Sequence, residues 1–447
     1  MGVAAGWGFS VDDALISARV AHHIATGFGY RFNAGGPVVD CVTPLGWAFL
    51  LAPAASGGAW QGMTWASGVG GAVWVLAALD LGRRCGGWCS GWRFALLALA
   101  LGSCLPLGAW AVSGMETGVV MALGVGALGK GRLGAACAGA AAALRPELLP
   151  WAVTLAFGSA LARRQPIRER VWALALALAP ALLVGGARWV AFGEPVPLAV
   201  YAKPSDAEHG LRYALGSLLL TGPPYLLLAG KAWRRLPRAH CAIGVALLVH
   251  WLVLLGVGGD WMPFWRLAMP TFPGVLLVGA ALLERSHAAF AGLRLAGVFA
   301  CAALLHWGQG SATRVVRADR SRMIAELAPL LTGARRVASV DVGWVGAAGA
   351  YEVIDLGGVT DPEIAYLPGG HTSKRLPPEL LERRDVDAMV LLLGPSTGDP
   401  ATQFARRVEE RAMRLRGAER FMPVGRVQLN PRQDYVVLRQ SAQGPAP

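Results

Sequence analysis

Charged residues are scarce in this chain of 447 residues. They make up 15% of the sequence, whereas hydrophobic residues make up 54%, and the mean hydropathy is +0.45. This composition is typical of a bundle of apolar membrane helices. In a chain with so few charges, the presence of two adjacent acids, Asp12 and Asp13, needs an explanation. Acids at the surface of an apolar bundle are candidates for an active site.

The chain also lacks the charge pattern of a nucleic-acid-binding protein, although its net charge is +13. Residues 311–447 carry 19 Lys and Arg against 16 Asp and Glu, so an excess of +10 lies in residues 1–310. These excess basic residues lie in short loops between apolar runs, which is where membrane proteins carry them. Nucleic acid is therefore not an expected partner.

Cysteine is absent from residues 311–447, and the seven cysteines before them predict no disulfide framework for this tail. Patterns of metal ligands are also missing. Neither HxxxH nor HxxE accompanies His22 and His23, which we interpret as polar interface residues. Cys85 and Cys89 have no further ligand nearby and are interpreted as small packing residues. The sequence predicts no metal ligands.

Apolar runs before residue 310 predict about ten membrane spans, several of them shorter than the roughly 20 residues of a straight span. The composition changes near residue 310. We expect a transmembrane domain over residues 1–310, with a first outer loop at residues 1–58, and a C-terminal domain over residues 311–447. The predicted spans are about 60–82, 93–111, 115–129, 132–146, 148–163, 171–191, 211–230, 240–257, 267–284 and 291–309.

The loops on the two sides of these spans differ in kind. Fifteen of the 22 basic residues of residues 1–310 fall on one side, which the positive-inside rule makes cytoplasmic. The polar motifs and the C-terminal domain fall on the other side. The stretch before Asp12 is too short for a span or a signal peptide, so we expect the true start to lie upstream and one apolar helix to be missing.

Motifs on the outer side resemble those of GT-C membrane glycosyltransferases. The stretch DDALISARVAHHIATGFGYRFNAGGPVVDCVTPLGW at residues 12–47 resembles their first extracytoplasmic loop. The nearest branch includes the mycobacterial terminal β-arabinofuranosyltransferase. The further matches, in order, are SGMET (113–117), LRPE (144–147), VYAK (200–203) and GGDWM (258–262) with Arg266, and residues 337–366 resemble the extracytoplasmic tail. Asp40-Cys41 departs from the Glu-Gly of relatives, and the aromatic-rich acceptor loop also differs, which leaves the sugar open.

The resemblance implies an α-helical polytopic protein of the bacterial inner membrane, with a C-terminal extracytoplasmic α/β domain and the active site on the same external face. It implies an inverting glycosyltransferase that moves a sugar from a polyprenyl-phosphate donor to an extracytoplasmic glycan, lipid or protein acceptor. No cofactor is expected. A divalent metal is left open but not favoured, because Arg and Lys can neutralise a monophosphate leaving group.

Such a transfer needs a base for the acceptor hydroxyl and cations for the departing phosphate. Asp12 or Asp13 would be the base, with one of the pair positioning the other. The candidates for binding the donor are Arg145, Lys203 and Arg266, with Arg19 as a further choice and with Glu116, Glu147 and Asp260 beside them. Trp261 and His371 are weaker candidates for acceptor binding.

Three of these residues also have a structural interpretation. Asp12 precedes ALISARVAHHIA and is a good N-cap for that helix. Arg145 would form an ion pair with Glu116 or Glu147 that holds two helix ends together. Asp260 follows two glycines and would be a turn residue.

The tail alternates four apolar strand patterns with helical stretches, which predicts an α/β domain. The strand patterns are VASVDV, YEVIDLGG, DAMVLLLG and DYVVLRQ, and the helical stretches are ELLERR and ATQFARRVEERAMRLR (401–416). The tail's glycine-rich stretch VDVGWVGAAGA lacks GxGxxG, and we reject a nucleotide loop there.

Two other functions compete with the transferase. A transporter is disfavoured because no inverted repeat or pair of broken helices is visible. A non-catalytic relative that only binds polyprenyl lipid is the second alternative.

Overall fold

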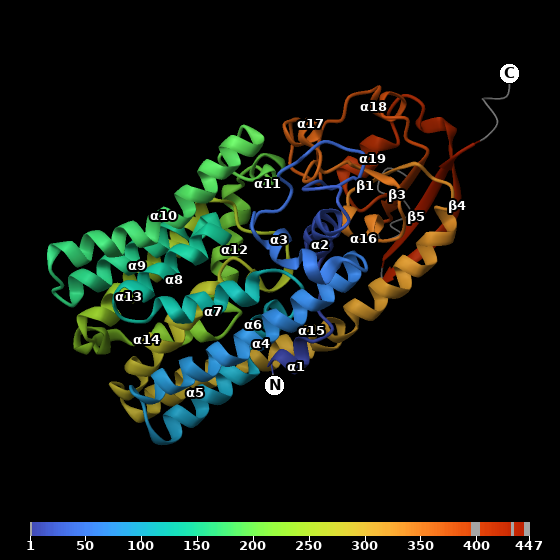
Figure 1. The fold of residues 1–447 in the computed structure, drawn as a ribbon. Coiled ribbons are helices and arrows are strands. Elements are labelled where there is room, and N and C mark those ends of the chain that lie inside the picture. Colours follow the sequence, from blue (N-terminus) through green and yellow to red (C-terminus); the bar gives the residue numbers. More distant parts are fainter. Residues whose placement is uncertain (1, 395–402, 431–432, 442–447) are drawn as a thin grey trace. The chain divides into compact units, whose positions relative to one another are not determined.

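The computed structural model describes residues 2–394, 403–430 and 433–441 (Figure 1). The chain forms two compact units that do not follow chain order. The bundle unit comprises Met1–Ser10, Trp65–Ala187 and Ser205–Val315, and the sheet unit comprises Val11–Thr64, Arg188–Pro204 and Val316–Pro447. The boundary expected near residue 310 falls inside helix α15 (Ala288–Leu330), which contributes to both units. Residues 11–58 of the expected first outer loop therefore belong to the same unit as the tail, whereas residues 1–10 belong to the bundle unit.

The bundle unit is built almost wholly of helices. In chain order, the helices with their main part in this unit are α1 (Gly2–Gly6), α4 (Ala59–Gly86), α5 (Gly91–Ser103), α6 (Leu105–Ala111), α7 (Thr117–Ala127), α8 (Gly131–Leu144), α9 (Leu149–Ala162), α10 (Ile167–Phe192), α12 (Ala207–Leu219), α13 (Arg238–Gly256), α14 (Phe272–Glu284) and α15. Small residues let them pack closely: a Cβ added at Gly139 of α8 would lie 2.1 Å from the Leu176 carbonyl oxygen of α10.

Five helices are long and apolar enough to cross a membrane, by length and composition, among the described residues. They are Ala59–Gly86, Ile167–Phe192, Arg238–Gly256, Pro263–Glu284 and Ala288–Leu330, and the bent pair α5 and α6, with an angle of 48° between them, would make a sixth. The expected membrane-type helical bundle is thus confirmed, whereas the count of ten spans is not.

The missing spans are apolar runs that fold into short helices. Helices α7, α8 and α9 have 11, 14 and 14 residues, or about 16–21 Å at 1.5 Å per residue, against a hydrocarbon core of about 30 Å. The run at 211–230 is interrupted after α12, where Gly222 adopts a φ of 97° before Pro223. Hydropathy registers apolar composition but not the breaks that glycine and proline introduce.

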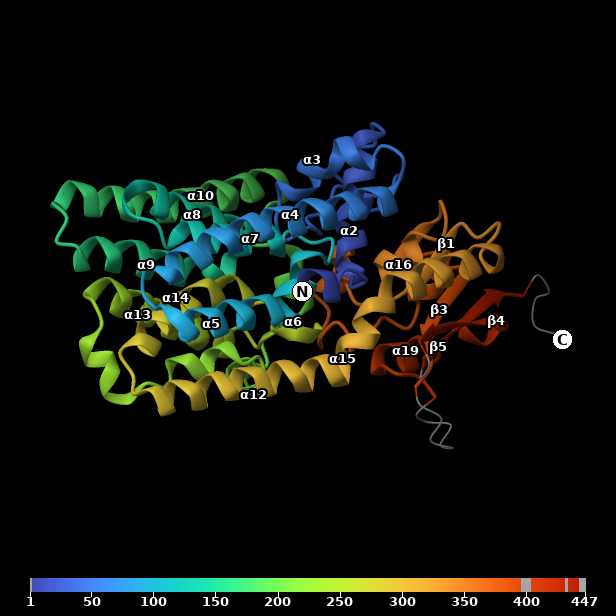
Figure 2. The same ribbon diagram turned by 90° about the horizontal axis from the view of Figure 1, so that it is seen from below.

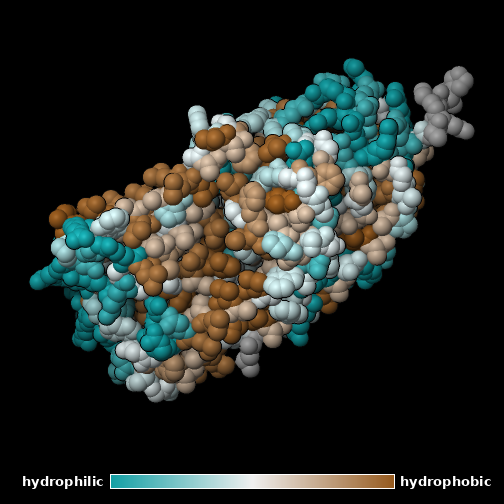
Figure 3. All heavy atoms as spheres, viewed as in Figure 1, coloured by the Kyte–Doolittle hydropathy of each residue, from teal (hydrophilic) through white to brown (hydrophobic). Residues whose placement is uncertain are grey.

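The basic loops of the bundle unit gather at one end of it (Figures 1 and 3). Arg93 pairs with Glu284 at 3.6 Å, and Arg132 pairs with Glu169 at 2.8 Å. Trp88 contacts His240 with 4.2 Å between the ring centroids. Hydrophobic atoms dominate the sides of the helices, and hydrophilic atoms gather at this end (Figure 3). This is the distribution that the loop charges predict.

The sheet unit contains a five-stranded mixed sheet in the order β2-β1-β3-β5-β4. Strands β1, β3, β4 and β5 are labelled in Figure 2. Strands β1 (Arg336–Ser339), β2 (Glu352–Asp355) and β3 (Ala388–Leu392) are parallel, and β5 (Gln433–Gln440) and β4 (Phe421–Asn430) are antiparallel to their neighbours. The four expected strands are all present, and β4 was not expected. The apolar run of β3 is buried throughout, as the central position requires.

Seven further α-helices in the described ranges have their main part in the sheet unit. They are α2 (Asp12–Ala25), α3 (Trp47–Leu51), α11 (Leu198–Ala202), α16 (Val342–Gly346), α17 (Pro362–Ala365), α18 (Leu380–Arg383) and α19 (Arg407–Ala412). Of the helical stretch expected at 401–416, residues 401–402 lie outside the described part of the chain.

A buried ion pair joins the loop after α2 to the end of α10. Arg188, 1% exposed, donates from Nε to the Asp40 carboxylate at 2.7 Å and from Nη2 to the carbonyls of Val42 and Thr43. The charge of Asp40 is matched by an arginine that lies 148 residues away in the sequence.

We predict that Arg188→Met lowers the free energy of unfolding by about 3–5 kcal/mol, because it leaves the Asp40 charge buried and unpaired. The double variant Asp40→Leu/Arg188→Met should recover part of that loss. Thermal unfolding of the detergent-solubilised protein measures both, with the exposed Arg83→Met as the control. A double variant no more stable than Arg188→Met would contradict this account.

Candidate functional site

The structure divides the predicted site residues between the two units. Asp12, Asp13, Arg19, Lys203 and His371 lie in the sheet unit. The bundle unit holds the other predicted residues, which are Glu116, Arg145, Glu147, Asp260, Trp261 and Arg266.

The Asp12 carboxylate binds the first turn of helix α16. Oδ2 accepts from the Gly343 N–H at 3.0 Å, and Oδ1 accepts from the Trp344 N–H at 2.6 Å. The first N–H groups of a helix have no partner within it, so a carboxylate there is favoured. A Cβ at Gly343 would lie 2.2 Å from the Asp12 carbonyl oxygen, so glycine is needed for this approach.

Arg19 binds the other end of α16. It lies seven residues after Asp12, which is two helical turns and the same face of α2. Its guanidinium donates to the carbonyl of Gly346, the last residue of α16, and to those of Phe32 and Tyr351, both at 2.9 Å. Burial lowers the pKa of Arg19 to about 10. With its donors directed at carbonyls, Arg19 is suited to holding α16 and not to the phosphate contact expected of it.

The interpretation of Asp12 as the N-cap of its own helix is wrong. Asp12 is the first residue of α2, its N-cap is Val11, and no side chain caps that end. The carboxylate caps α16 instead, because Gly343 and Trp344 present their N–H groups beside it.

Asp13 points to a different partner from its neighbour. The Lys203 ammonium, which directly follows α11, lies 3.9 Å from Asp13 Oδ2. The side chains of Asp13 and Lys203 are 24% and 23% exposed. A carboxylate and an ammonium group thus lie together within reach of solvent.

A second carboxylate lies close to Asp12. Asp341, just after β1, accepts two hydrogen bonds from Arg406 at 2.9 and 2.8 Å and one from the Tyr435 hydroxyl. Burial, followed by the charge of Asp341, raises the pKa of Asp12 well above its usual range, and the two N–H groups of α16 oppose the shift.

Asp341, Arg406 and Tyr435 were not predicted from the sequence. The one signal for them is that Asp341 follows the strand pattern VASV, since ligand-facing groups in α/β sheets lie after strand ends. Arg406 and Tyr435 carry no such signal because they belong to distant segments.

In the bundle unit, Arg145 lies between two carboxylates. Its Nε is 3.3 Å from Glu116 and 3.3 Å from Glu147, and Arg145 and Glu116 are 3% and 0% exposed. The ion pair expected as the structural role of Arg145 is therefore present. Arg145 Nη2 has no hydrogen-bond partner within the described part of the chain.

Asp260 and Arg266 form a second buried pair, with 2.8 Å between Oδ2 and Nε. The turn before them needs glycine: Gly259 has a φ of 71°, and a Cβ there would lie 2.5 Å from the Tyr213 Cβ. The turn itself lies at Val257 and Gly258, and Asp260, which was expected as a turn residue, follows the turn and pairs with Arg266. Phe264 and Trp265 also have positive φ values, 61° and 49°, a conformation that costs non-glycine residues about 1–3 kcal/mol.

The remaining candidates lie elsewhere. The Trp261 ring stacks on His209 with 4.2 Å between the ring centroids, which occupies one of its faces. His371 lies beside the loop after β2, where a Cβ at Gly357 would be 3.1 Å from its carbonyl oxygen. His22 and His23 each contact a backbone carbonyl through Nδ1, that of Ala55 and that of Arg31. Over residues 2–394, 403–430 and 433–441, no three His, Cys, Asp or Glu residues are grouped as a metal site.

Comparison of the chain with models of protein families, with curated proteins and with solved structures finds no match.

We predict that Asp12→Asn destabilises the sheet unit by about 1–3 kcal/mol. An amide has one acceptor oxygen, so it leaves a buried N–H of α16 without a partner. Arg19→Met should have a similar effect at the other end of α16. Thermal unfolding and limited proteolysis measure this loss, and the exposed Asp385→Asn serves as the control. Equal melting temperatures for Asp12→Asn and the control would contradict the role given to Asp12.

A pH dependence follows from Glu409, which accepts from the Leu392 N–H at 3.0 Å and is 0% exposed. Burial raises its pKa from 4.5 to about 7, so the folded protein binds this proton more tightly than the unfolded chain does. Its contribution to stability is therefore full below pH 4.5 and decreases as the pH rises to about 7. Glu409→Gln keeps the acceptor and should remove this contribution. The free energy of unfolding of the wild type and of Glu409→Gln is measured at several pH values. The same pH dependence in both proteins would contradict the raised pKa of Glu409.

Proposed function

We propose that this protein is an inverting membrane glycosyltransferase that takes a sugar from a polyprenyl-phosphate donor and transfers it to an extracytoplasmic glycan, lipid or protein acceptor. The observation that carries the proposal is the Asp13–Lys203 pair, a carboxylate and an ammonium 3.9 Å apart and both accessible. They are the two charges that the reaction needs, a base and a cation for the leaving phosphate.

The two acids then have different roles. Asp12 has both oxygens engaged by α16 and is a positioning residue, which fixes the start of α2 and with it Asp13. Asp13 is the general base. Its carboxylate accepts the proton of the acceptor hydroxyl as that oxygen bonds to the anomeric carbon. The bond from this carbon to the phosphate oxygen breaks, and its electron pair leaves with the phosphate.

Lys203 offsets the charge that develops on the leaving phosphate. Attack from the face opposite the phosphate inverts the configuration of the anomeric carbon. Arg145 and Arg266 are less direct candidates for this task, because each is already paired with buried carboxylates. In the proposal, Glu116, Glu147 and Asp260 hold these two guanidinium groups, and the unpaired Nη2 of Arg145 is the donor available to a ligand.

The proposal places the protein in the bacterial inner membrane, with the sheet unit outside the cell. The gathering of the basic loops at one end of the bundle unit supports a cytoplasmic assignment of that end. The helices long enough to span a membrane support an integral protein.

We predict that Asp13→Asn lowers sugar transfer about 100- to 10,000-fold, because it removes the general base. Lys203→Met should lower kcat, and Lys203→Arg should restore part of it. The assay uses membranes with radiolabelled polyprenyl-phosphate sugars. Glu208→Gln, an exposed acid paired with Arg212, is the matched control and should keep full transfer.

Each outcome separates the alternatives. Full transfer by Asp13→Asn would rule out its catalytic role. Binding of the polyprenyl lipid by the wild type without transfer from any donor would favour the non-catalytic relative. Movement of the lipid or the sugar across sealed vesicles without transfer would favour the transporter.

A further inference from the structure

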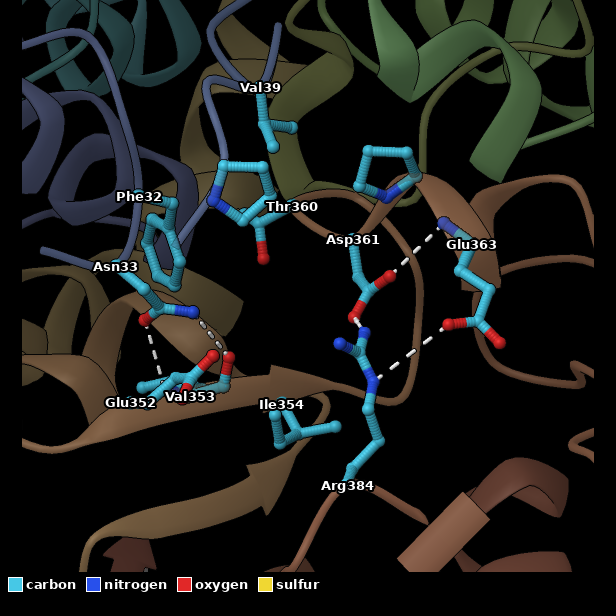
Figure 4. A pocket seen from close by; sticks show the side chains of 12 residues that line it. Phe32, Asn33, Val39, Glu352, Val353, Ile354, Thr360, Asp361, Glu363 and Arg384 are labelled. Atoms are coloured by element: carbon cyan, nitrogen blue, oxygen red, sulfur yellow. Dashed lines mark hydrogen bonds and ion pairs between the residues drawn. The ribbon is translucent and has the colours of Figure 1, made fainter. Parts of the chain in front are cut away.

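The sheet unit contains a cavity of about 270 Å³ that the reaction above does not use (Figure 4). One wall comes from the loop after α2, with Phe32, Asn33 and Val39. The opposite wall comes from β2, the loop that follows it and α17. That wall includes Ile354, Thr360, Asp361 and Glu363, and Arg384, which directly follows α18, also lines the cavity.

The walls are fixed before any ligand arrives. The Asn33 amide exchanges two hydrogen bonds, both 2.9 Å, with the backbone of Val353 at the edge of the sheet. Asp355 accepts from the N–H groups of Gly357 at 2.8 Å and Thr360 at 2.7 Å, which sets the loop after β2. A preformed site of this kind loses little entropy when it binds.

Three acids and one arginine line the cavity, and each of the acids is paired with an arginine. Arg384 pairs with Asp361 and lies 3.9 Å from Glu363 (Figure 4), and Glu352 pairs with Arg336 at 2.9 Å. A phosphate or a cation would have to displace one of these partners. A neutral ligand with many hydroxyl groups need not, because hydroxyls donate to carboxylates and accept from a guanidinium. The apolar Phe32, Val39 and Ile354 complement the C–H faces of such a ligand.

An aromatic pair lies at the end of α17, the helix that contributes Glu363 to the cavity. Tyr366 directly follows α17, is 55% exposed, and lies 4.9 Å from the Tyr201 ring. The Tyr201 hydroxyl donates to Glu194 at 2.7 Å. Tyr201 comes two residues before Lys203, so α11 connects this pair to the ammonium assigned to the donor phosphate. Exposed aromatic rings offer a face on which a sugar ring stacks.

We propose that this cavity together with Tyr366 is a binding site for a neutral saccharide. Its volume lies just below the roughly 300–1,000 Å³ of pockets for drug-sized ligands, which suits one or two sugar rings. The role of this site rests on the proposed function: it is the subsite for the end of the acceptor glycan. Tyr201 and Tyr366 guide that end towards Asp13.

The test measures saccharide binding apart from transfer. The full chain in detergent is titrated with linear arabinose, galactose and mannose trisaccharides, followed by saturation-transfer NMR. We expect at least one to bind, Tyr366→Ala to weaken its binding about tenfold, and Tyr366→Phe to retain it because the ring remains. Glu363→Gln should weaken binding about tenfold through the loss of a charged acceptor. Glu326→Gln, an acid of similar exposure that also lies beside an arginine, is its matched control.

A second readout uses the transfer assay. Tyr366→Ala should raise KM for the acceptor and leave the slow release of free sugar from the donor to water unchanged. Absence of binding by the wild type at millimolar trisaccharide, or equal binding by Tyr366→Ala and the wild type, would overturn the saccharide site while leaving the transferase standing. Binding with no transfer from any donor would overturn the transferase and leave the site. Thermal unfolding of each variant verifies that it is folded.

Discussion

The sheet unit depends on the clamping of one short helix by two opposite charges. Asp12 binds the N–H groups at the start of α16, and Arg19 binds the carbonyl at its end. Each charge complements the partial charge of the helix end that it meets. A five-residue helix has little stability alone, so α16 depends on these contacts at its two ends. The Asp13 position follows from this clamp, since Asp13 is the next residue of the same turn.

Charge is scarce in this chain, and buried ionic side chains in both units lie in ion pairs. Arg188 pairs with Asp40, Arg145 pairs with Glu116 and Glu147, and Asp260 pairs with Arg266. A buried charge without a partner costs several kcal/mol, so in a chain this apolar each ionic group needs a partner. The Asp13–Lys203 pair differs from these buried pairs because its two side chains are 24% and 23% exposed, and the proposed reacting role of Asp13 depends on this exposure.

The sequence was informative where the signal is local. Strand patterns located β1, β2, β3 and β5, and the two glycines before Asp260 located a turn. Partners across long separations could not be predicted: nothing near Asp12 points to Gly343, and nothing near Asp40 points to Arg188. The number of spans was not confirmed because α7, α8 and α9 are apolar but short. Strand β4 was not expected, since Pro423 and Gly425 interrupt its pattern at an irregularity in the pairing.

The clamp around α16 also has a consequence for biosynthesis. Asp12 and Gly343 are 331 residues apart, so a ribosome adding roughly 5–20 residues per second needs about 15–70 s to supply the second partner after the first. During that interval the carboxylate of Asp12 and the guanidinium of Arg19 have none of their contacts with α16. The N-terminal loop is therefore completed only when the last third of the chain emerges, and any truncated product retains its acids without the helix that orders them.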